Sequence, residues 1–273
     1  MPAKLGIVAG SGALPGKVIE LCRRTGRDCF VLAFEGETDP SILDGIDHIW
    51  TRLGAAGTNF RNLREAGVGE IVLVGGLRRP SLSAMRPDWR AAKFFARVGL
   101  RALGDDGLLS AVIKELEAEG FTLVGVDTLL TDAVAGEGPY GRHRPDQQAE
   151  SDLAHGFHIV HTLGTLDIGQ AAIVQQGLVL GVEAIEGTDE LIRRCGALRR
   201  PGPGGVLIKA KKPGQERRAD LPTIGPRTIE LAHEAGLRGI AIQAGSSLIV
   251  DQDRVVALAD ANGLFVLGRG TGS

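Results

Sequence analysis

The chain has 273 residues, of which 43% are hydrophobic, so it is long enough to build two ordinary domains with separate cores. Its 31 basic and 33 acidic residues leave a net charge of −2, which excludes a general polyanion binder, so we expect no nucleic-acid partner. Glycine is in excess at 40 residues and aromatic residues make up only 4%, which favours an α/β core of small and branched aliphatic side chains.

The number of cysteines and the N-terminal sequence indicate the cellular compartment of the protein. The three cysteines form no C-x-x-C pair and are odd in number, so neither a disulfide framework nor a zinc ribbon is predicted. The chain starts with a strand-like segment instead of an apolar signal stretch, so export is not expected. No segment approaches the ~20 apolar residues of a membrane span. We expect a cytoplasmic protein, which can still touch a membrane surface.

The first half of the sequence alternates short apolar runs with helical periods, as an open parallel sheet requires. Strands are predicted at 5–9, 29–33, 71–74 and 121–126, and helices at 15–24, 61–66, 88–103 and 107–119. We therefore expect a Rossmann-like N-terminal domain over residues 1–130. Residues 131–145 mix glycine and proline without periodicity, which predicts an interdomain linker.

A different order of elements is predicted beyond the linker. The helices expected there are 146–165, 189–195 and 226–235, and the strands are 171–175, 178–183, 206–209, 239–243, 248–250 and 264–267. The first two of these strands flank Gly177 and predict a hairpin. Together they indicate a second α/β domain over residues 146–273.

A glycine-rich turn follows the first predicted strand and reads Gly10-Ser-Gly-Ala-Leu-Pro-Gly16. Such a turn before a helix can bring backbone N–H groups and the positive end of the helix close to a phosphate. Its spacing is one residue longer than the usual dinucleotide fingerprint. Gly10, Ser11 and Gly12 are therefore candidates for substrate binding, and the alternative is a tight turn that serves helix and strand packing.

A second loop, Gly75-Gly-Leu-Arg-Arg-Pro80, follows a later strand. Ligands collect at the carboxyl ends of strands in open α/β sheets, and paired arginines can clamp a phosphate. We interpret Gly75, Gly76, Arg78 and Arg79 as substrate-binding candidates, with a solvated loop as the alternative. Asp105 and Asp106 open the next helix, where they could cap it or hold a metal ion.

The helix between these loops carries a basic stripe beside aromatic side chains. The basic residues are Arg86, Arg90, Lys93, Arg97 and Arg101, and the aromatic ones are Trp89, Phe94 and Phe95. Such a stripe suits anionic headgroups or acyl chains, so it suggests contact with a membrane surface. The alternative is an ordinary solvated helix face.

Polar candidates recur along the second half of the chain: Gln170, Thr188, Asp189, Lys209, Gln215 and Asp220. Carboxylates with a lysine and amides are what a hard cation such as Mg²⁺ and a phosphate substrate need. Thr188 and Asp189 begin a predicted helix and could simply cap it. Asp220 lies in a stretch broken by proline, so a solvated helix face does not explain it.

Taken together and in order, these segments resemble the LpxI-type UDP-2,3-diacylglucosamine diphosphatases of lipid A biosynthesis. The resemblance covers nearly the whole chain. It is carried by Ile7-Val-Ala-Gly-Ser-Gly-Ala-Leu-Pro15, Gly75-Gly-Leu-Arg-Arg-Pro80, Gly104-Asp-Asp-Gly-Leu-Leu109, Leu166-Asp-Ile-Gly-Gln170, Glu186-Gly-Thr-Asp189 and Asp220-Leu-Pro-Thr-Ile-Gly225.

The resemblance implies a cytosolic, Gram-negative hydrolase that uses Mg²⁺, with Mn²⁺ as a substitute. It would cut UDP-2,3-diacylglucosamine into UMP and 2,3-diacylglucosamine 1-phosphate (lipid X), with water attacking the sugar-side phosphorus and substrate held in a crevice between the domains. Asp220 matches the aspartate associated with activity in the family.

From position and chemistry we add Asp189 as a second catalytic residue, and Asp105, Asp106 and Asp189 as metal ligands beside Asp220. Peripheral contact with the inner membrane and a homodimer are both compatible with the sequence. Two alternatives stay open: an NAD(P)-dependent oxidoreductase, and a nucleotide-sugar-binding module without enzymatic activity.

Overall fold

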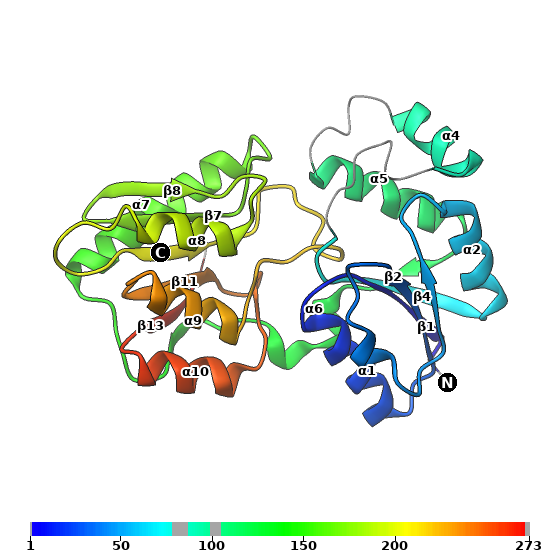
Figure 1. The fold of residues 1–273 in the computed structure, drawn as a ribbon, viewed down its shortest axis with the longest axis horizontal. Coiled ribbons are helices and arrows are strands. Elements are labelled where there is room, and N and C mark those ends of the chain that lie inside the picture. Colours follow the sequence, from blue (N-terminus) through cyan, green and yellow to red (C-terminus); the bar gives the residue numbers. More distant parts are fainter. Residues whose placement is uncertain (1, 78–86, 99–104, 271–273) are drawn as a thin grey trace. The chain divides into compact units, whose positions relative to one another are not determined.

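The computed structural model describes residues 2–77, 87–98 and 105–270, and its chain forms two compact units (Figure 1). The first unit comprises Met1–Thr131 and Glu216–Asp220, and the second comprises Asp132–Gln215 and Leu221–Ser273. Both units are α/β, which confirms the predicted fold class. The expectation of one continuous domain over 146–273 is corrected at one place, because Glu216–Asp220 packs with the first unit.

The first unit is built on a parallel sheet of five strands. Their order is β3 (His48–Thr51), β2 (Cys29–Phe34), β1 (Lys4–Ala9), β4 (Val68–Val74) and β5 (Thr122–Leu123). The chain runs from β1 toward one edge of the sheet and later continues from β4 toward the other edge. The carboxyl ends of β1 and β4 therefore mark the topological switch point, which is where open α/β sheets bind ligands.

Helices cover both faces of this sheet (Figure 1). On one side lie α1 (Leu14–Thr25) and the short α6 (Val126–Leu129), and on the other lie α2 (Ala56–Glu65), α4 (Trp89–Val98) and α5 (Asp105–Ala118). Phe60, Leu63, Ile113 and Leu116 pack α2 and α5 against buried side chains of the strands. A 3-10 turn, η1 (Pro40–Leu43), follows β2.

The second unit contains a mixed sheet of six strands. Their order is β6 (Gly138–Tyr140), β13 (Phe265–Arg269), β11 (Gly239–Gln243), β9 (Val206–Lys209), β7 (Ala171–Gln175) and β8 (Leu178–Val182). Strands β13, β11 and β9 are parallel, whereas β6, β7 and β8 each pair in the antiparallel sense. A separate parallel pair joins β10 (Thr223–Ile224) to β12 (Leu248–Ile249). The predicted hairpin around Gly177 is confirmed.

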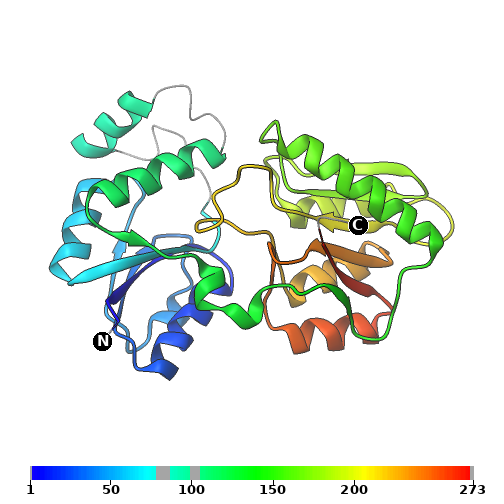
Figure 2. The ribbon, with the colours of Figure 1, turned by 180° about the vertical axis from the view of Figure 1, so that it is seen from behind.

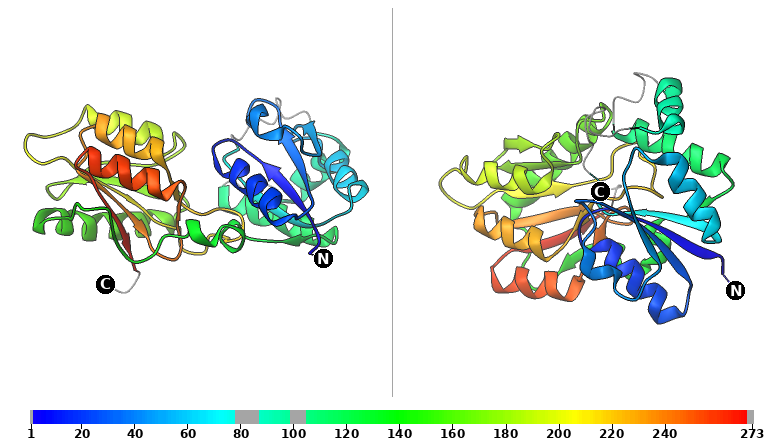
Figure 3. Two further views of the ribbon diagram at one scale, coloured as in Figure 1. Left: turned by 90° about the horizontal axis from the view of Figure 1, so that it is seen from below. Right: turned by 45° about the vertical axis from the view of Figure 1, so that its right-hand side comes forward.

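This sheet is the middle layer of the unit (Figure 3, left). Helix α7 (Gln147–Gly164), green in Figure 2, packs on one face, and α8 (Thr188–Gly196), α9 (Pro226–Glu234) and α10 (Gln252–Ala261) pack on the other. Gly156 lets α7 approach the sheet, because a Cβ there would lie 2.2 Å from Cδ1 of Ile208. Among the described residues, no helix combines the length and apolar character needed to cross a membrane.

Several elements differ from those predicted. The segment expected to be a linker contains a 3-10 turn, η3 (Thr131–Ala133), and strand β6. Strand β6 was not predicted, because glycine and proline are uncommon inside strands. The predicted strand 121–126 is shorter, because the chain turns into α6 after Gly125. Strand β3 was not predicted, since it is short and partly exposed. Helix α10 was not predicted either. It buries only Val255 and Ala259, so its apolar residues show little helical periodicity.

Candidate active site

The two predicted glycine loops are hydrogen-bonded to each other at the switch point. The Ser11 amide donates to the Gly76 carbonyl at 2.7 Å, and the Gly76 amide donates to the Ser11 carbonyl at 3.1 Å. The Ser11 hydroxyl donates to the same Gly76 oxygen at 2.9 Å, and the Gly10 amide donates to Val74 at 2.8 Å. The amides of Gly10, Ser11 and Gly76 are therefore engaged inside the protein, which supports the packing alternative for these positions.

This close approach requires glycine on both sides. A Cβ on Gly10 would lie 2.3 Å from the Gly76 oxygen, and one on Gly75 would lie 2.5 Å from the Ser11 oxygen. Gly75 also has a φ of +88°, which side chains disfavour. By contrast, a Cβ on Gly12 would meet no described atom within 4 Å, so the backbone there borders open space beside the start of α1.

We predict that Gly75→Ala destabilises the protein more than Gly263→Ala does. Both positions have a positive φ, at +88° and +72°, so both variants carry a backbone cost of about 1 kcal/mol. Only Gly75 lacks room for a methyl group, which adds roughly 1–3 kcal/mol. Urea denaturation measures both losses in the free energy of unfolding. Equal losses would contradict the close contact between the two loops.

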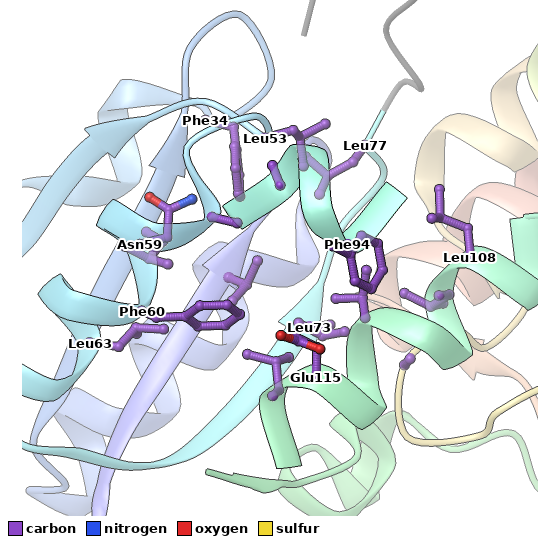
Figure 4. A pocket seen from close by; sticks show the side chains of 18 of the residues that line it. Phe34, Leu53, Asn59, Phe60, Leu63, Leu73, Leu77, Phe94, Leu108 and Glu115 are labelled. Atoms are coloured by element: carbon purple, nitrogen blue, oxygen red, sulfur yellow. The ribbon is translucent and has the colours of Figure 1, made fainter. Parts of the chain in front are cut away.

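An apolar cavity of about 450 Å³ opens next to these loops, within the first unit. One side of the cavity is the face of the sheet at β1, β2 and β4, and the other is formed by α2, α4 and α5. Figure 4 shows Phe60 and Leu63 from α2 around the same space as Phe94 from α4 and Leu108 from α5. Gly75 and Gly76 lie at its wall. The cavity suits a long apolar group.

Two charged side chains at the cavity wall, Arg90 and Glu115, form ion pairs. Glu115, which is labelled in Figure 4, forms ion pairs with Arg97 and, at 3.8 Å, with Arg90. Arg90 also pairs with Glu119, and its guanidinium lies 4.9 Å from the centre of the Phe60 ring. These ion pairs fasten α4 to α5 and leave a lining that is mostly apolar.

The basic stripe predicted on α4 is therefore only partly available to a membrane. Arg90 and Arg97 turn to glutamates of the same unit, whereas Lys93 is exposed and Trp89 has an exposed fraction of 84%. The remaining two arginines of the stripe, at positions 86 and 101, lie outside the described residues.

Asp220 reaches the same cavity from a distant part of the sequence. It lines the wall together with Ala219, whose side chain packs against the apolar core of the first unit. The amides of Ala219 and Asp220 both donate to the Glu216 carbonyl, at 3.1 and 3.3 Å, and so form a single tight turn. The structure thus places Asp220, Gly75 and Gly76 in the wall of one cavity, which is the candidate site.

The side chains of four predicted residues are not among those that the structure describes. Arg78 and Arg79 lie outside the described residues. Asp105 and Asp106 begin α5, but the described side chains of that helix start at Leu108. Their predicted roles in binding phosphate and metal stay predictions.

The other predicted residues lie near the end of β9 and the start of β7 in the second unit, a region that we call the polar edge. The backbone N–H of Gln170 donates to Oε2 of Glu183 at 3.2 Å, and the Thr188 hydroxyl donates to Oε1 of the same carboxylate at 2.7 Å. Lys209 ends β9 and donates from Nζ to the Thr223 carbonyl at 3.1 Å. Glu183 and Lys209 are only 6% and 7% exposed, so this edge holds buried charges of both signs.

Two amide side chains complete this polar edge. Oε1 of the buried Gln215 accepts a hydrogen bond from the Lys212 amide at 3.0 Å and so fixes the loop that follows β9. The buried Oε1 of Gln170 has no hydrogen-bond partner among the described residues. A buried acceptor without a partner is a position where a hydrogen-bond donor of a ligand could bind.

The predicted catalytic pair is divided between the units. Asp189, in the first turn of α8, accepts a hydrogen bond from Nε of Arg227 at 2.7 Å, and this contact raises the pKa of the arginine. It belongs to the second unit, whereas Asp220 belongs to the first. Within the described part of the chain, no group of three or more histidine, cysteine, aspartate or glutamate side chains is arranged to hold a metal ion.

Comparisons with known proteins identify a family. The sequence model for the LpxI N-terminal domain matches residues 4–133, and the one for the LpxI C-terminal domain matches residues 136–267. The UDP-2,3-diacylglucosamine pyrophosphatase LpxI of Caulobacter vibrioides is 41% identical over 272 residues, which cover 97% of each chain.

Solved structures align only loosely with this chain. CobK precorrin-6A reductase is 10% identical, with 100% of this chain and 89% of that one covered, and its TM-score is 0.35. The UDP-glucose 4-epimerase of Thermus thermophilus is 15% identical, with 98% and 86% covered and a TM-score of 0.31. Scores this low establish no common fold or function.

Proposed function

This chain belongs to the LpxI family, and from that premise we propose that it hydrolyses the diphosphate bond of UDP-2,3-diacylglucosamine to UMP and lipid X. The observation that carries the proposal is the apolar cavity of the first unit, which has a carboxylate, Asp220, in its wall. A substrate with two acyl chains attached to a sugar phosphate needs both features. Family membership also decides against the oxidoreductase and the binding module without activity.

The cavity is the proposed site for the acyl chains. Burial of each methylene group stabilises a complex by about 0.8 kcal/mol, so an apolar cavity of this size contributes a large part of the substrate's affinity. Besides Asp220, the charged residues of its wall are Glu115, which pairs with Arg97, and Arg90, which pairs with Glu119. An acyl chain that enters therefore meets aromatic and aliphatic side chains without displacing water from an unpaired charge.

Asp220 is the proposed catalytic group. A carboxylate can accept the proton of the attacking water or hold a cation that lowers the pKa of that water. Asp220 lies in the wall of the cavity proposed for the acyl chains, so its carboxylate would come close to the phosphate on the sugar that carries them. This placement supports attack of water on the sugar-side phosphorus, which would leave the new oxygen in lipid X.

Mg²⁺ is the proposed cofactor, with Mn²⁺ as a substitute. Mg²⁺ commonly binds through one or two protein carboxylates together with substrate phosphates and water, so it does not require a cage of protein ligands. A single carboxylate at Asp220 fits that mode, and Asp105, Asp106 and Asp189 are the proposed additional ligands. The ion would supply charge neutralisation at the diphosphate.

The polar edge of the second unit is the proposed site for the UMP portion of the substrate. Lys209 offers a cation there, and Gln170 offers a buried carbonyl oxygen that lacks a partner among the described residues. Thr188 and Gln215 are proposed to contribute polar contacts. Lysine suits a phosphate group, and an amide oxygen suits the N–H of a base.

We also propose a cytoplasmic enzyme that touches the inner membrane, because a substrate with two acyl chains resides in a bilayer. Helix α4 is the proposed contact, since Trp89 and Lys93 are exposed on it and Phe94 lines the cavity. Tryptophan and lysine favour the interface between headgroups and acyl chains.

The activity is tested by incubating the purified protein with UDP-2,3-diacylglucosamine and measuring UMP by chromatography. We expect UMP and lipid X in equal amounts with Mg²⁺, none with EDTA, and recovery when Mg²⁺ or Mn²⁺ is added in excess. UDP-N-acetylglucosamine, which lacks the long acyl chains, serves as the control and should be a poor substrate. Absence of UMP in every condition would refute the activity, and equal release with EDTA would refute the metal requirement.

A further inference from the structure

The segment that carries Asp220 joins the first unit from outside its continuous chain. Gln215 before it and Leu221 after it both belong to the second unit, so only Glu216–Asp220 packs with the first. These residues lie in turns and outside any helix or strand. Its position at the cavity therefore depends on the contacts that this short segment makes with the first unit.

The first of these contacts joins the segment to the start of α6. Nε of Arg217 donates to Oδ2 of Asp127 at 2.6 Å. The Asp127 carboxylate is largely buried, with an exposed fraction of 8%, while that of Arg217 is 49%. The backbone also comes close at this point, because a Cβ on Gly125 would lie 3.4 Å from Cα of Arg218. A buried acid without its cation is unfavourable, so this pair strongly prefers to form.

The second contact joins the segment to α5. Nη1 of Arg218 donates to Oε1 of Glu117 at 2.9 Å. Two other nitrogens of the same guanidinium donate to the two carboxylate oxygens of Glu216, at 3.0 and 2.9 Å, which is a bidentate arrangement. Hydrogen bonds from Arg218 to Glu216 and Glu117 raise the pKa of this arginine, so the charge that makes the contacts is kept.

These contacts lead directly to the backbone of Asp220. Arg218 fixes the side chain of Glu216, and the carbonyl of Glu216 accepts the amides of Ala219 and Asp220. The contacts on α5 and α6 are thus connected to the backbone of Asp220 through Arg217, Arg218 and Glu216 of the same turn.

We propose that Asp127, Arg217, Glu117 and Arg218 form a clamp that positions Asp220 for the reaction. The inference rests on the proposed function. The four side chains are positioning residues, because they act through the turn and none of them lines the cavity. A displacement of about 1 Å at a catalytic group can lower the rate ~100-fold, so loss of the clamp is expected to lower turnover.

The test compares Arg217→Gln and Asp127→Asn with the wild-type enzyme in UMP release. We expect kcat to fall ~10–100-fold and KM to stay within about 3-fold, because the cavity itself is untouched. Arg217→Lys keeps the ion pair and should recover most of the turnover. Arg254→Gln, which removes an exposed arginine of the second unit, is the control and should behave as wild type.

Amide hydrogen exchange gives a readout that does not depend on activity. In Arg217→Gln, the amides of Ala219 and Asp220 should exchange faster than in the wild type, while those of the first sheet should not change. Unchanged kcat in an active Arg217→Gln enzyme, or unchanged exchange at both amides, would overturn the clamp alone. A wild-type protein that releases no UMP would overturn the proposed function, and the positioning role with it.

Discussion

Asp220→Asn is expected to lower the rate of UMP release by at least ~10²–10⁴-fold, the usual contribution of a positioned acid or base. The substitution removes the negative charge but keeps the size of the side chain. Asp220 is partly exposed at the cavity wall, and it belongs to neither a helix nor a strand. The midpoint of thermal unfolding should therefore stay close to that of the wild type, so the loss reports on chemistry.

Asp253→Asn is the matched control for this experiment. Asp253 is exposed in the first turn of α10 and is not among the residues assigned to the site, so its variant should retain full turnover. Rates of UMP release under saturating substrate compare the two variants directly. If Asp220→Asn turned over within about 10-fold of the wild type, the catalytic role of Asp220 would be wrong.

Leu109→Trp is expected to reduce kcat/KM for the diacylated substrate by roughly 60-fold. Leu109 lines the cavity from α5 and is only partly buried, so a larger side chain there can fill the cavity without rebuilding the core. If the indole displaces about three methylene groups of the acyl chains, the loss is about 2.4 kcal/mol at ~0.8 kcal/mol each.

A substrate analogue with acetyl groups in place of the long acyl chains distinguishes loss of acyl-chain binding from damage to the fold. It should react with Leu109→Trp and with the wild type at similar rates, because its short chains do not reach the cavity. Leu198→Trp, at a residue of the second unit that is 53% exposed, is the control and should not change either rate. Equal losses for both substrates would show that the substitution harms the site in another way.

The positions of the buried strands along the chain could be predicted because their apolar runs are continuous. Strands β1, β2 and β4 of the first unit and β9 and β11 of the second lie in the cores and match the predicted segments to within a few residues. Edge elements could not be predicted as well. Strand β6 has the sequence Gly-Pro-Tyr, and its pairing with β13 comes from contacts distant in the sequence.

In the candidate site too, local sequence motifs could be predicted, whereas contacts between residues distant in the sequence could not. Asp220 stands out in the sequence because prolines surround it, and its motif has a family match. That its segment packs with the first unit depends on Arg217 and Arg218 meeting Asp127 and Glu117, which no local pattern reveals. The cavity likewise arises from three helices and a sheet face.

The glycine loops show where a correct motif can have a second explanation. Gly10 and Gly75 follow β1 and β4 as predicted, at the switch point of the sheet. Their structural requirement is the hydrogen-bonded contact between Ser11 and Gly76. Two loops in close contact and a loop that binds a phosphate both require glycine after the strand, so the sequence alone does not distinguish them.

Photocrosslinking tests most directly whether the acyl chains lie beside Asp220. UDP-2,3-diacylglucosamine with a diazirine near the end of one acyl chain would be bound to Asp220→Asn, irradiated and mapped by mass spectrometry of the peptides. We predict crosslinks in peptides of α2, α4 and α5, the helices that line the cavity of the first unit. Crosslinks confined to residues 132–215 and 221–273 would contradict the assignment of this cavity to the lipid.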